Sequence, residues 1–156
     1  GYGDGTFLPN NLIKREELTK IIVTAFETEG SDGDINFADI NKNEWYYPFV
    51  KKAYNAGIVK GMSDETFGTS SYVTRQDIAV MLSRVLEKYG ENLEFTKDCI
   101  AFADENEISA YASDGVKTLY KLGVISGYED GTFKPSGSAT RAEVAYMVNS
   151  ILNILK

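Results

Sequence analysis

Apolar residues recur at the spacing of one helix face in three long segments of the chain. Each segment repeats an apolar residue every three or four positions, which is the pattern of an amphipathic helix. The apolar positions are Leu18, Ile22, Ala25 and Phe26; Ile78, Leu82, Val85 and Leu86; and Val144, Val148, Ile151, Leu152 and Leu155. We therefore expect three helices of about four turns each, with Leu18, Ile78 and Val144 in the core.

Two shorter apolar stripes lie between the long ones. Trp45, Phe49, Ala53 and Ala56 fall on one helix face, and Gly57 follows as a C-terminal stop. The later copy of this stripe, also closed by a glycine, is Val116, Leu119, Tyr120 and Gly123. These stripes predict two further helices and a mainly α fold.

Threonines mark the starts of two of the long helices. An acidic residue stands three positions after each threonine, as in a capping box. The pairs are Thr74 with Asp77, a weaker version, and Thr140 with Glu143. The first long helix has Lys14 at the matching position, so we expect it to begin earlier, with Asn10 or Asn11 as its cap.

Two motifs recur three times in a fixed order, the signature of tandem repeats. A loop of the type Gly-Tyr-x-Asp-Gly-Thr-Phe is followed each time by a four-residue arginine motif. The loops span residues 1–7, 61–67 and 127–133, and the arginine motifs span residues 14–17, 74–77 and 140–143. The second copy follows the first by 60 residues and the third follows the second by 66, whether counted from Gly1 to Gly61 to Gly127 or from Arg15 to Arg75 to Arg141.

A further motif occurs only twice. Phe37-Ala38-Asp39 matches Phe102-Ala103-Asp104, and each precedes one of the shorter helices. The chain therefore holds about two and a half helix–loop–helix repeats, because the first copy lacks this opening half. We assign residues 1–30 to the second half of the first repeat, residues 31–93 to the second repeat and residues 94–156 to the third.

The loops read as tight turns because glycine and aspartate favour them. Very short strands are possible where each loop ends, at Thr6–Phe7, Thr66–Phe67 and Thr132–Phe133. We assign the three phenylalanines of these pairs to the core.

The composition excludes several classes of function. A net charge of −7 disfavours nucleic acid, which needs a broad basic surface. The chain has no histidine and one cysteine, Cys99, so an intramolecular disulfide, a Cys–His catalytic pair and a usual zinc site are excluded. Cys99 reads as a buried structural thiol. No apolar run is long enough to span a bilayer, and we expect no membrane insertion, no cofactor and no catalysis.

A calcium loop is a weak alternative for one acidic stretch. Asp32, Asp34 and Asn36 alternate like oxygen ligands, but Asn43 stands where an EF-hand loop carries its closing glutamate. A solvated acidic linker is the better interpretation, and we expect no metal site.

At these motifs the sequence resembles the S-layer homology family. That family opens each repeat on Phe-x-Asp, carries a Trp or Tyr soon after, and continues through a Gly-Tyr-x-Asp-Gly-x-Phe-x-Pro loop to a Thr-Arg-Ala-Glu helix start. The closest copy here is Tyr128 to Pro135 followed by Ala139 to Glu143. The resemblance covers essentially the whole chain.

The resemblance implies a fold, a location and a ligand. The fold would be three helix–loop–helix repeats in a pseudo-threefold arrangement with grooves between neighbours. The location would be the extracellular face of a bacterial cell wall, and the ligand a secondary cell-wall polysaccharide, often pyruvylated. The glycan-binding residues that it implies are Arg15, Arg75 and Arg141; Asp4, Asp64 and Asp130; Tyr2 and Tyr128; and Trp45 and Tyr111.

The residues themselves support an anion receptor. An arginine at the first position of a helix faces the positive end of the helix dipole, at a cost of about 0.3–1 kcal/mol. A bound carboxylate would offset this cost, because helix-start N–H groups and a guanidinium together bind anions. Aromatic rings would stack on a sugar. Two alternatives stay open. In the first, each arginine pairs with an aspartate of a loop and only fixes that loop to the helix. In the second, Trp45 is a core residue and not a platform for a sugar.

Departures from the family pattern limit the number of sites. Met62 replaces the loop tyrosine, Glu65 replaces its second glycine, and Lys14 replaces threonine. We expect one or two competent grooves. The incomplete first repeat also suggests a different class of function, self-association as a homo-oligomer or within a surface layer.

Overall fold

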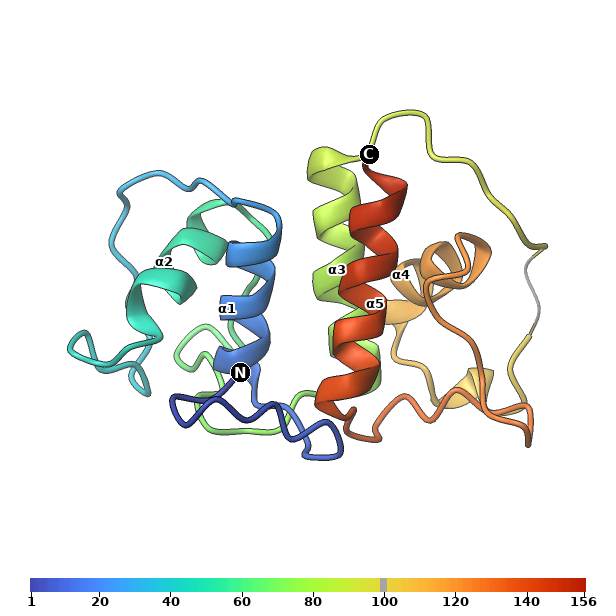
Figure 1. The fold of residues 1–156 in the computed structure, drawn as a ribbon, viewed down its shortest axis with the longest axis horizontal. Coiled ribbons are helices and arrows are strands. Elements are labelled where there is room, and N and C mark those ends of the chain that lie inside the picture. Colours follow the sequence, from blue (N-terminus) through green and yellow to red (C-terminus); the bar gives the residue numbers. More distant parts are fainter. Residues whose placement is uncertain (99–100) are drawn as a thin grey trace. The chain divides into compact units, whose positions relative to one another are not determined.

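The structure is a computed structural model that describes residues 1–98 and 101–156, so the expected burial of Cys99 lies outside the described residues. The described residues form five α-helices and one short 3-10 helix and no extended strand, which confirms the mainly helical fold (Figure 1). The helices are α1 (Arg15–Ala25), α2 (Tyr47–Asn55), α3 (Arg75–Tyr89), α4 (Ala110–Lys121) and α5 (Arg141–Ile154), with the 3-10 helix η1 at Glu105–Glu107. The chain forms two compact units, one of residues 13–73 and one of residues 1–12 with 74–156.

In the unit of residues 13–73, α1 packs against α2 (Figure 1). Apolar side chains from both helices and from the segments around them are removed from solvent. The fully buried ones are Ile13, Leu18, Ile22, Val50, Ala53, Ile58 and Phe67. Burial of each large side chain in such a core contributes roughly 1.5–3 kcal/mol.

Helix α1 begins at Arg15, so the earlier start expected at Asn10 or Asn11 is wrong. The Lys14 N–H donates to Glu17 Oε2 at 2.9 Å, and the Arg15 N–H donates to the Ser71 carbonyl at 3.0 Å. The N–H groups of Thr140 and Arg141 bond in the same way, to Glu143 Oε2 and to the Asn11 carbonyl, so α1 begins at the matching position although Lys14 has no threonine hydroxyl. The helix has 11 residues and is shorter than the four turns expected. It ends before Glu27, whose φ of 47° is left-handed.

Helix α2 begins at Tyr47, two residues after Trp45. Its buried face is therefore shifted from the expected stripe and comprises Tyr46, Val50 and Ala53. Gly57 ends the helix as predicted, with a φ of +77° that only glycine adopts without strain.

In the second unit, α3 packs against α4 and also contacts α5 (Figure 1). Gly115 lets α4 lie close to α3, since an added Cβ would come within 3.0 Å of Ser83 Oγ and 3.3 Å of the Ala79 carbonyl oxygen. Buried apolar residues line the faces of all three helices, as the sequence pattern predicts. They include Ile78, Leu82, Val85, Val116, Leu119, Val144, Val148 and Ile151.

Backbone pairing occurs as isolated bridges, not as strands at the ends of the loops. Among the described residues the bridges join Leu12 with Thr140, Lys14 with Tyr72 and Thr74 with Ser138. These residues stand directly before the three long helices, where Lys14, Thr74 and Thr140 have extended backbone angles. The boundaries of the three repeats and their pseudo-threefold arrangement stay predictions. No helix in the described part of the chain has the length and apolar character needed to cross a membrane.

The predicted caps of α3 and α5 are confirmed. Thr140 Oγ1 accepts from the Glu143 N–H, and Glu143 Oε2 accepts from the Thr140 N–H at 2.7 Å. At the start of α3, Thr74 Oγ1 accepts from the Asp77 N–H and donates to Asp77 Oδ2.

We predict that Thr140→Ala lowers the free energy of unfolding by about 1 kcal/mol, because it removes an N-cap acceptor. Asn149→Ala, an exposed change on the same helix, should leave the stability within about 0.5 kcal/mol of the original. Urea denaturation followed by circular dichroism measures both variants. Equal stabilities for the two would contradict the role of the cap.

Candidate functional site

The three arginines of the repeated motif occupy the first position of α1, α3 and α5, as predicted for the two threonine-capped helices. Their side chains are buried, with exposed fractions of 7% for Arg15, 5% for Arg75 and 5% for Arg141. Each one extends from its own helix to the loop of a different repeat. The described contacts therefore join helix starts to loops that are distant in the sequence.

Arg75 has the most complete set of contacts. Its Nε donates to the Phe133 carbonyl at 2.8 Å, and its Nη1 forms an ion pair with Glu143 Oε1 at 2.8 Å. The guanidinium carbon lies 4.7 Å from the centre of the Tyr128 ring, within the range of a cation–π contact. The carboxylate partner of Arg75 is thus Glu143, so the alternative in which this arginine pairs with a loop aspartate is wrong.

Arg141 repeats this geometry on the first loop. Its Nε donates to the Phe7 carbonyl at 2.9 Å, and its guanidinium carbon lies 4.4 Å from the centre of the Tyr2 ring. A guanidinium that binds both a carbonyl and a ring holds the two ends of one loop together. Arginine suits this role because its planar donors and its flat face act at the same time.

Arg15 departs from this geometry. Its Nη2 donates to the Lys60 carbonyl at 2.8 Å, and its guanidinium carbon lies 5.1 Å from the centre of the Phe67 ring. Met62 takes the place of the loop tyrosine and is 62% exposed. The contact with the loop phenylalanine is shared by all three arginines, since the guanidinium carbon of Arg75 lies 5.1 Å from the ring centre of Phe133 and that of Arg141 lies 5.4 Å from the ring centre of Phe7. At Arg15 the contact with a loop tyrosine is missing, because Met62 stands at that position.

The aspartates of the first and third loops hold their own turns. Asp4 Oδ1 accepts from the Thr6 N–H at 2.9 Å and from the Thr6 hydroxyl at 2.7 Å, and these bonds lower the Asp4 pKa. Bonds from the Thr132 hydroxyl and N–H, with a smaller effect of Lys134, lower the pKa of Asp130 to about 2. Both carboxylates are therefore ionised throughout the physiological range.

The second loop forms a different turn. Gly5 and Gly131 have φ values of +83° and +78°, and Glu65 stands at the matching position without a positive φ. Here the Ser63 hydroxyl accepts from the Glu65 N–H at 3.2 Å and from the Thr66 N–H at 3.1 Å. The turn is thus held one residue earlier than in the other loops, at Ser63 and not at Asp64.

Asp39 is a structural residue whose role the sequence analysis did not assign. Its Oδ1 accepts from the Phe67 N–H at 2.8 Å, and its Oδ2 accepts from the N–H groups of Gly68 and Thr69 at 2.7 Å each. Desolvation alone would raise the Asp39 pKa, but the three N–H donors together lower it. This carboxylate fixes the end of the second loop.

Asp104 does the same for the third loop, with 2.8 Å bonds from the N–H groups of Phe133 and Lys134. The repeated Phe-x-Asp motif was the sequence signal for both aspartates. Its spacing could not show that the carboxylate would reach a loop about thirty residues later.

Trp45 and Tyr111, two of the four aromatic residues expected to stack on a sugar, are exposed. Trp45 is 48% exposed and its ring centre lies 5.3 Å from Lys20 Nζ, so the alternative that places Trp45 in the core is wrong. Tyr111 is 61% exposed, and its hydroxyl donates to Asp77 Oδ1 at 2.8 Å. Both rings are available at the surface of their units.

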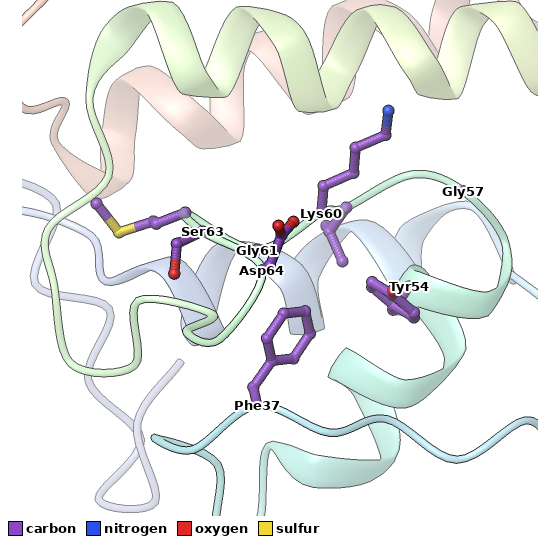
Figure 2. A pocket seen from close by; sticks show the side chains of 9 residues that line it. Phe37, Tyr54, Gly57, Lys60, Gly61, Ser63 and Asp64 are labelled. Atoms are coloured by element: carbon purple, nitrogen blue, oxygen red, sulfur yellow. The ribbon is translucent and has the colours of Figure 1, made fainter.

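A pocket of about 590 Å³ lies in the unit of residues 13–73. Figure 2 shows Phe37 on the segment before α2, Tyr54 on α2, and Lys60 and Asp64 on the segment that follows α2. The Phe37 and Tyr54 rings meet edge to face at 5.3 Å between centres. The sequence analysis missed this pocket, although a tyrosine recurs at the same place in the later copy, where Tyr120 meets Phe102 at 5.4 Å.

The assignment of the three loop phenylalanines to the core is correct for two of them. Phe67 and Phe133 are 0% and 1% exposed, whereas Phe7 is 42% exposed. Phe67 packs on Phe37 at 6.0 Å and Phe133 packs on Phe102 at 5.4 Å between ring centres. No ring of a Phe-x-Asp segment in residues 1–98 or 101–156 packs on Phe7.

An aspartate of the acidic stretch before α2 lies close to two lysines. Asp34 lies 3.6 Å from Lys42 Nζ and 4.0 Å from Lys51 Nζ. Within residues 1–98 and 101–156, no three acidic or thiol side chains are grouped so that they could hold a metal ion.

Comparison with known proteins agrees with these motifs. The family model of the S-layer homology domain matches residues 1–19, 36–79 and 101–145, more than half of the chain. The chain therefore belongs to the S-layer homology family. The gap before residue 36 falls where the sequence analysis finds an inter-repeat linker.

Three relatives illustrate the contexts in which similar segments occur. An endoglucanase of Bacillus sp. (strain KSM-635) is 30% identical over 97% of this chain and 16% of its own length. A cellulosome-anchoring protein of Acetivibrio thermocellus is 30% identical over 97% of this chain and 34% of its own length. A surface-layer 125 kDa protein of Lysinibacillus sphaericus is 30% identical over 93% of this chain and 12% of its own length. The chain thus spans only a part of each relative.

We predict that Asp39→Asn destabilises the protein by about 2 kcal/mol at pH 7, because an amide NH₂ would face the N–H groups of Gly68 and Thr69. The exposed linker change Asp32→Asn should have no measurable effect.

The same variant should also alter the pH dependence of stability. The folded pKa of Asp39 lies below its ordinary value of 3.8, so its stabilisation is complete above about pH 5 and is lost as the pH falls through the folded pKa. Between about pH 5 and pH 2, the original protein should therefore lose more stability than Asp39→Asn. Urea titrations across this range measure the difference, and parallel pH profiles would contradict the assignment.

Proposed function

We propose that this chain is a non-catalytic module that anchors its polypeptide to an anionic, pyruvylated secondary cell-wall polysaccharide at the outer surface of a bacterium. Membership of the S-layer homology family and relatives named for cellulosome anchoring and surface layers support this proposal. The observation that carries it is the threefold recurrence of an arginine at a helix start that lies against a ring of a loop from another repeat. A helix cap alone does not require that arrangement.

The arginines would act mainly by holding the loops in a binding conformation. Since they are 5–7% exposed, only an edge of each guanidinium is open to a ligand. The loop backbones and exposed aromatic rings around them present the hydrogen-bonding groups and flat apolar faces that sugars require. The arginine charge lies just beneath that surface and favours an anionic sugar there.

The pocket of residues 13–73 is the best candidate for the charged end of the polymer. Its volume of about 590 Å³ is in the range of small-ligand sites. The Lys60 ammonium makes no ion pair within the described residues and would bind a pyruvyl carboxylate. The ring of Tyr54 would lie under a sugar. The Asp64 carboxylate would accept hydrogen bonds from sugar hydroxyls, because an ionised carboxylate only accepts and a hydroxyl can donate.

Catalysis is not part of the proposal. The repeated aspartates Asp4, Asp39, Asp104 and Asp130 accept hydrogen bonds that fix loops, and this accounts for their presence. The endoglucanase match covers 16% of that enzyme, so the similarity does not require its activity to reside in the matched segment.

Self-association is the alternative function, and the relative named as a surface-layer protein favours it. The exposed Phe7, Leu8 and Leu12 side chains would supply apolar area for such contacts. Light scattering of the purified chain across the micromolar range tests this function. A monomer at all concentrations would rule it out.

Co-sedimentation with peptidoglycan sacculi tests the anchoring function. Sacculi that keep their secondary polymer should pellet the chain, and sacculi stripped of that polymer with hydrofluoric acid should not. Binding that survives stripping would move the target to peptidoglycan. Absence of binding to sacculi from several Gram-positive sources would reject the proposal.

We predict that Lys60→Met weakens binding to untreated sacculi roughly three- to tenfold, because it removes a charge-assisted contact to the polymer. Its thermal unfolding should be unchanged, since Lys60 is exposed. Lys52→Met, an exposed change on α2, is the matched control and should bind like the original chain. Equal binding by both variants would remove the pocket from the site.

A further inference from the structure

Two cations lie over the ring of Tyr128. The Arg75 guanidinium carbon is 4.7 Å from the ring centre, and Lys134 Nζ is 4.2 Å from it. Arg75 is buried, whereas the Lys134 side chain is 50% exposed. The tyrosine itself is 38% exposed, so a ligand can reach it from solvent. Lys134 is therefore the cation that shares the solvent side of this ring.

The backbone of the third loop fixes the direction of the Lys134 side chain. Its φ of +57° is left-handed, which is unfavourable for lysine. The Lys134 N–H donates to Asp104 Oδ2 at 2.8 Å, and its carbonyl accepts from the Gly137 N–H at 3.0 Å. Because the residue is held on both sides, its side chain is directed back to Tyr128 at the start of the loop.

The second loop shows that this direction belongs to the position and not to lysine. Gly68 stands at the matching place and also has a positive φ, of +94°. A Cβ added at Gly68 would overlap the sulfur of Met62, which takes the place of the loop tyrosine. The residue after the loop phenylalanine therefore controls access to the residue in the tyrosine position.

The contacts that hold the Lys134 ammonium are replaceable. Its Nζ lies 3.3 Å from Asp130 Oδ2, in a pair whose side chains are 50% and 55% exposed. Ion pairs and cation–π contacts at such exposed places are individually weak. Asp130 also accepts from the N–H and the hydroxyl of Thr132, so its turn does not depend on the lysine. The ammonium can change its partner while the loop keeps its shape.

We propose that Lys134 makes the third loop selective for anionic sugars. A neutral sugar that stacks on Tyr128 must displace the ammonium from the ring, and it supplies no charge in return. A carboxylate on the sugar would bind the displaced ammonium through charge-assisted hydrogen bonds. This inference rests on the proposed function, and it adds the residue that distinguishes a charged polymer from an uncharged one.

Titrations of the ¹⁵N-labelled chain with two methyl glucosides test the proposal. One glucoside carries a pyruvyl ketal, and the other carries an ethylidene acetal, which has the same rings and no carboxylate. The shifts of the Tyr128 and Gly131 amide signals report binding at the third loop. There the ketal should bind at least about fivefold more tightly than the acetal, because only the ketal replaces the contacts that Lys134 loses.

Substitutions of Lys134 separate its charge from the rest of the loop. Lys134→Gly should bring the ratio of the two affinities close to one, because it removes the ammonium and uncovers the ring. Its thermal unfolding should show no loss of stability, since glycine adopts the left-handed φ without strain. Lys134→Arg keeps the charge and should keep the ratio. Lys156→Gly, a change of an exposed lysine outside the loop, is the control and should also keep it.

Two results would overturn the role of Lys134. One is equal binding of both glucosides by the original chain, or no third-loop shift with either of them. The other is a Lys134→Gly chain that keeps the original ratio, since the selectivity would then come from another group. Co-sedimentation with sacculi measures the anchoring function separately. A chain that pellets with untreated sacculi and yet binds both glucosides equally would retain that function and lose only the role of Lys134.

Discussion

A buried guanidinium between a helix start and a loop is the constraint on which the rest of the structure depends. Burial of a cation at the positive end of a helix is unfavourable unless hydrogen bonds and partner charges compensate it. Arg75 receives this compensation from the Phe133 carbonyl, the Glu143 carboxylate and the Tyr128 ring. Because all three groups must be in place together, the arginine fixes the loop and the start of its helix as one body.

The second constraint comes from the opposite side of the loop. Asp39 and Asp104 bind the loop backbone from the first half of their own repeats. A complete loop is therefore held by an arginine from one repeat and an aspartate from its own. A binding surface made of such loops depends on both restraints.

Much of the fold could be predicted from the sequence, because periodicity and caps act locally. The helix faces around Leu18, Ile78 and Val144 and the caps at Thr74 and Thr140 are examples. The predictions failed where the local structure depends on backbone groups that are distant in the sequence. The start of α1, for example, depends on the Ser71 carbonyl, which accepts from the Arg15 N–H. For the candidate site, the sequence identified the arginines. It could not predict which loop each arginine contacts, nor the pocket at Lys60, because both depend on contacts between residues distant in the sequence.

A double-mutant cycle between Arg75 and Tyr128 tests most directly whether the arginine and the loop act as one body. The free energies of unfolding of Arg75→Met, Tyr128→Leu and the double variant would be measured by urea denaturation. If the guanidinium and the ring stabilise each other as the 4.7 Å contact indicates, the coupling energy should be about 0.5–1.5 kcal/mol. Effects that add to within about 0.3 kcal/mol would show that the arginine does not hold the loop through its ring.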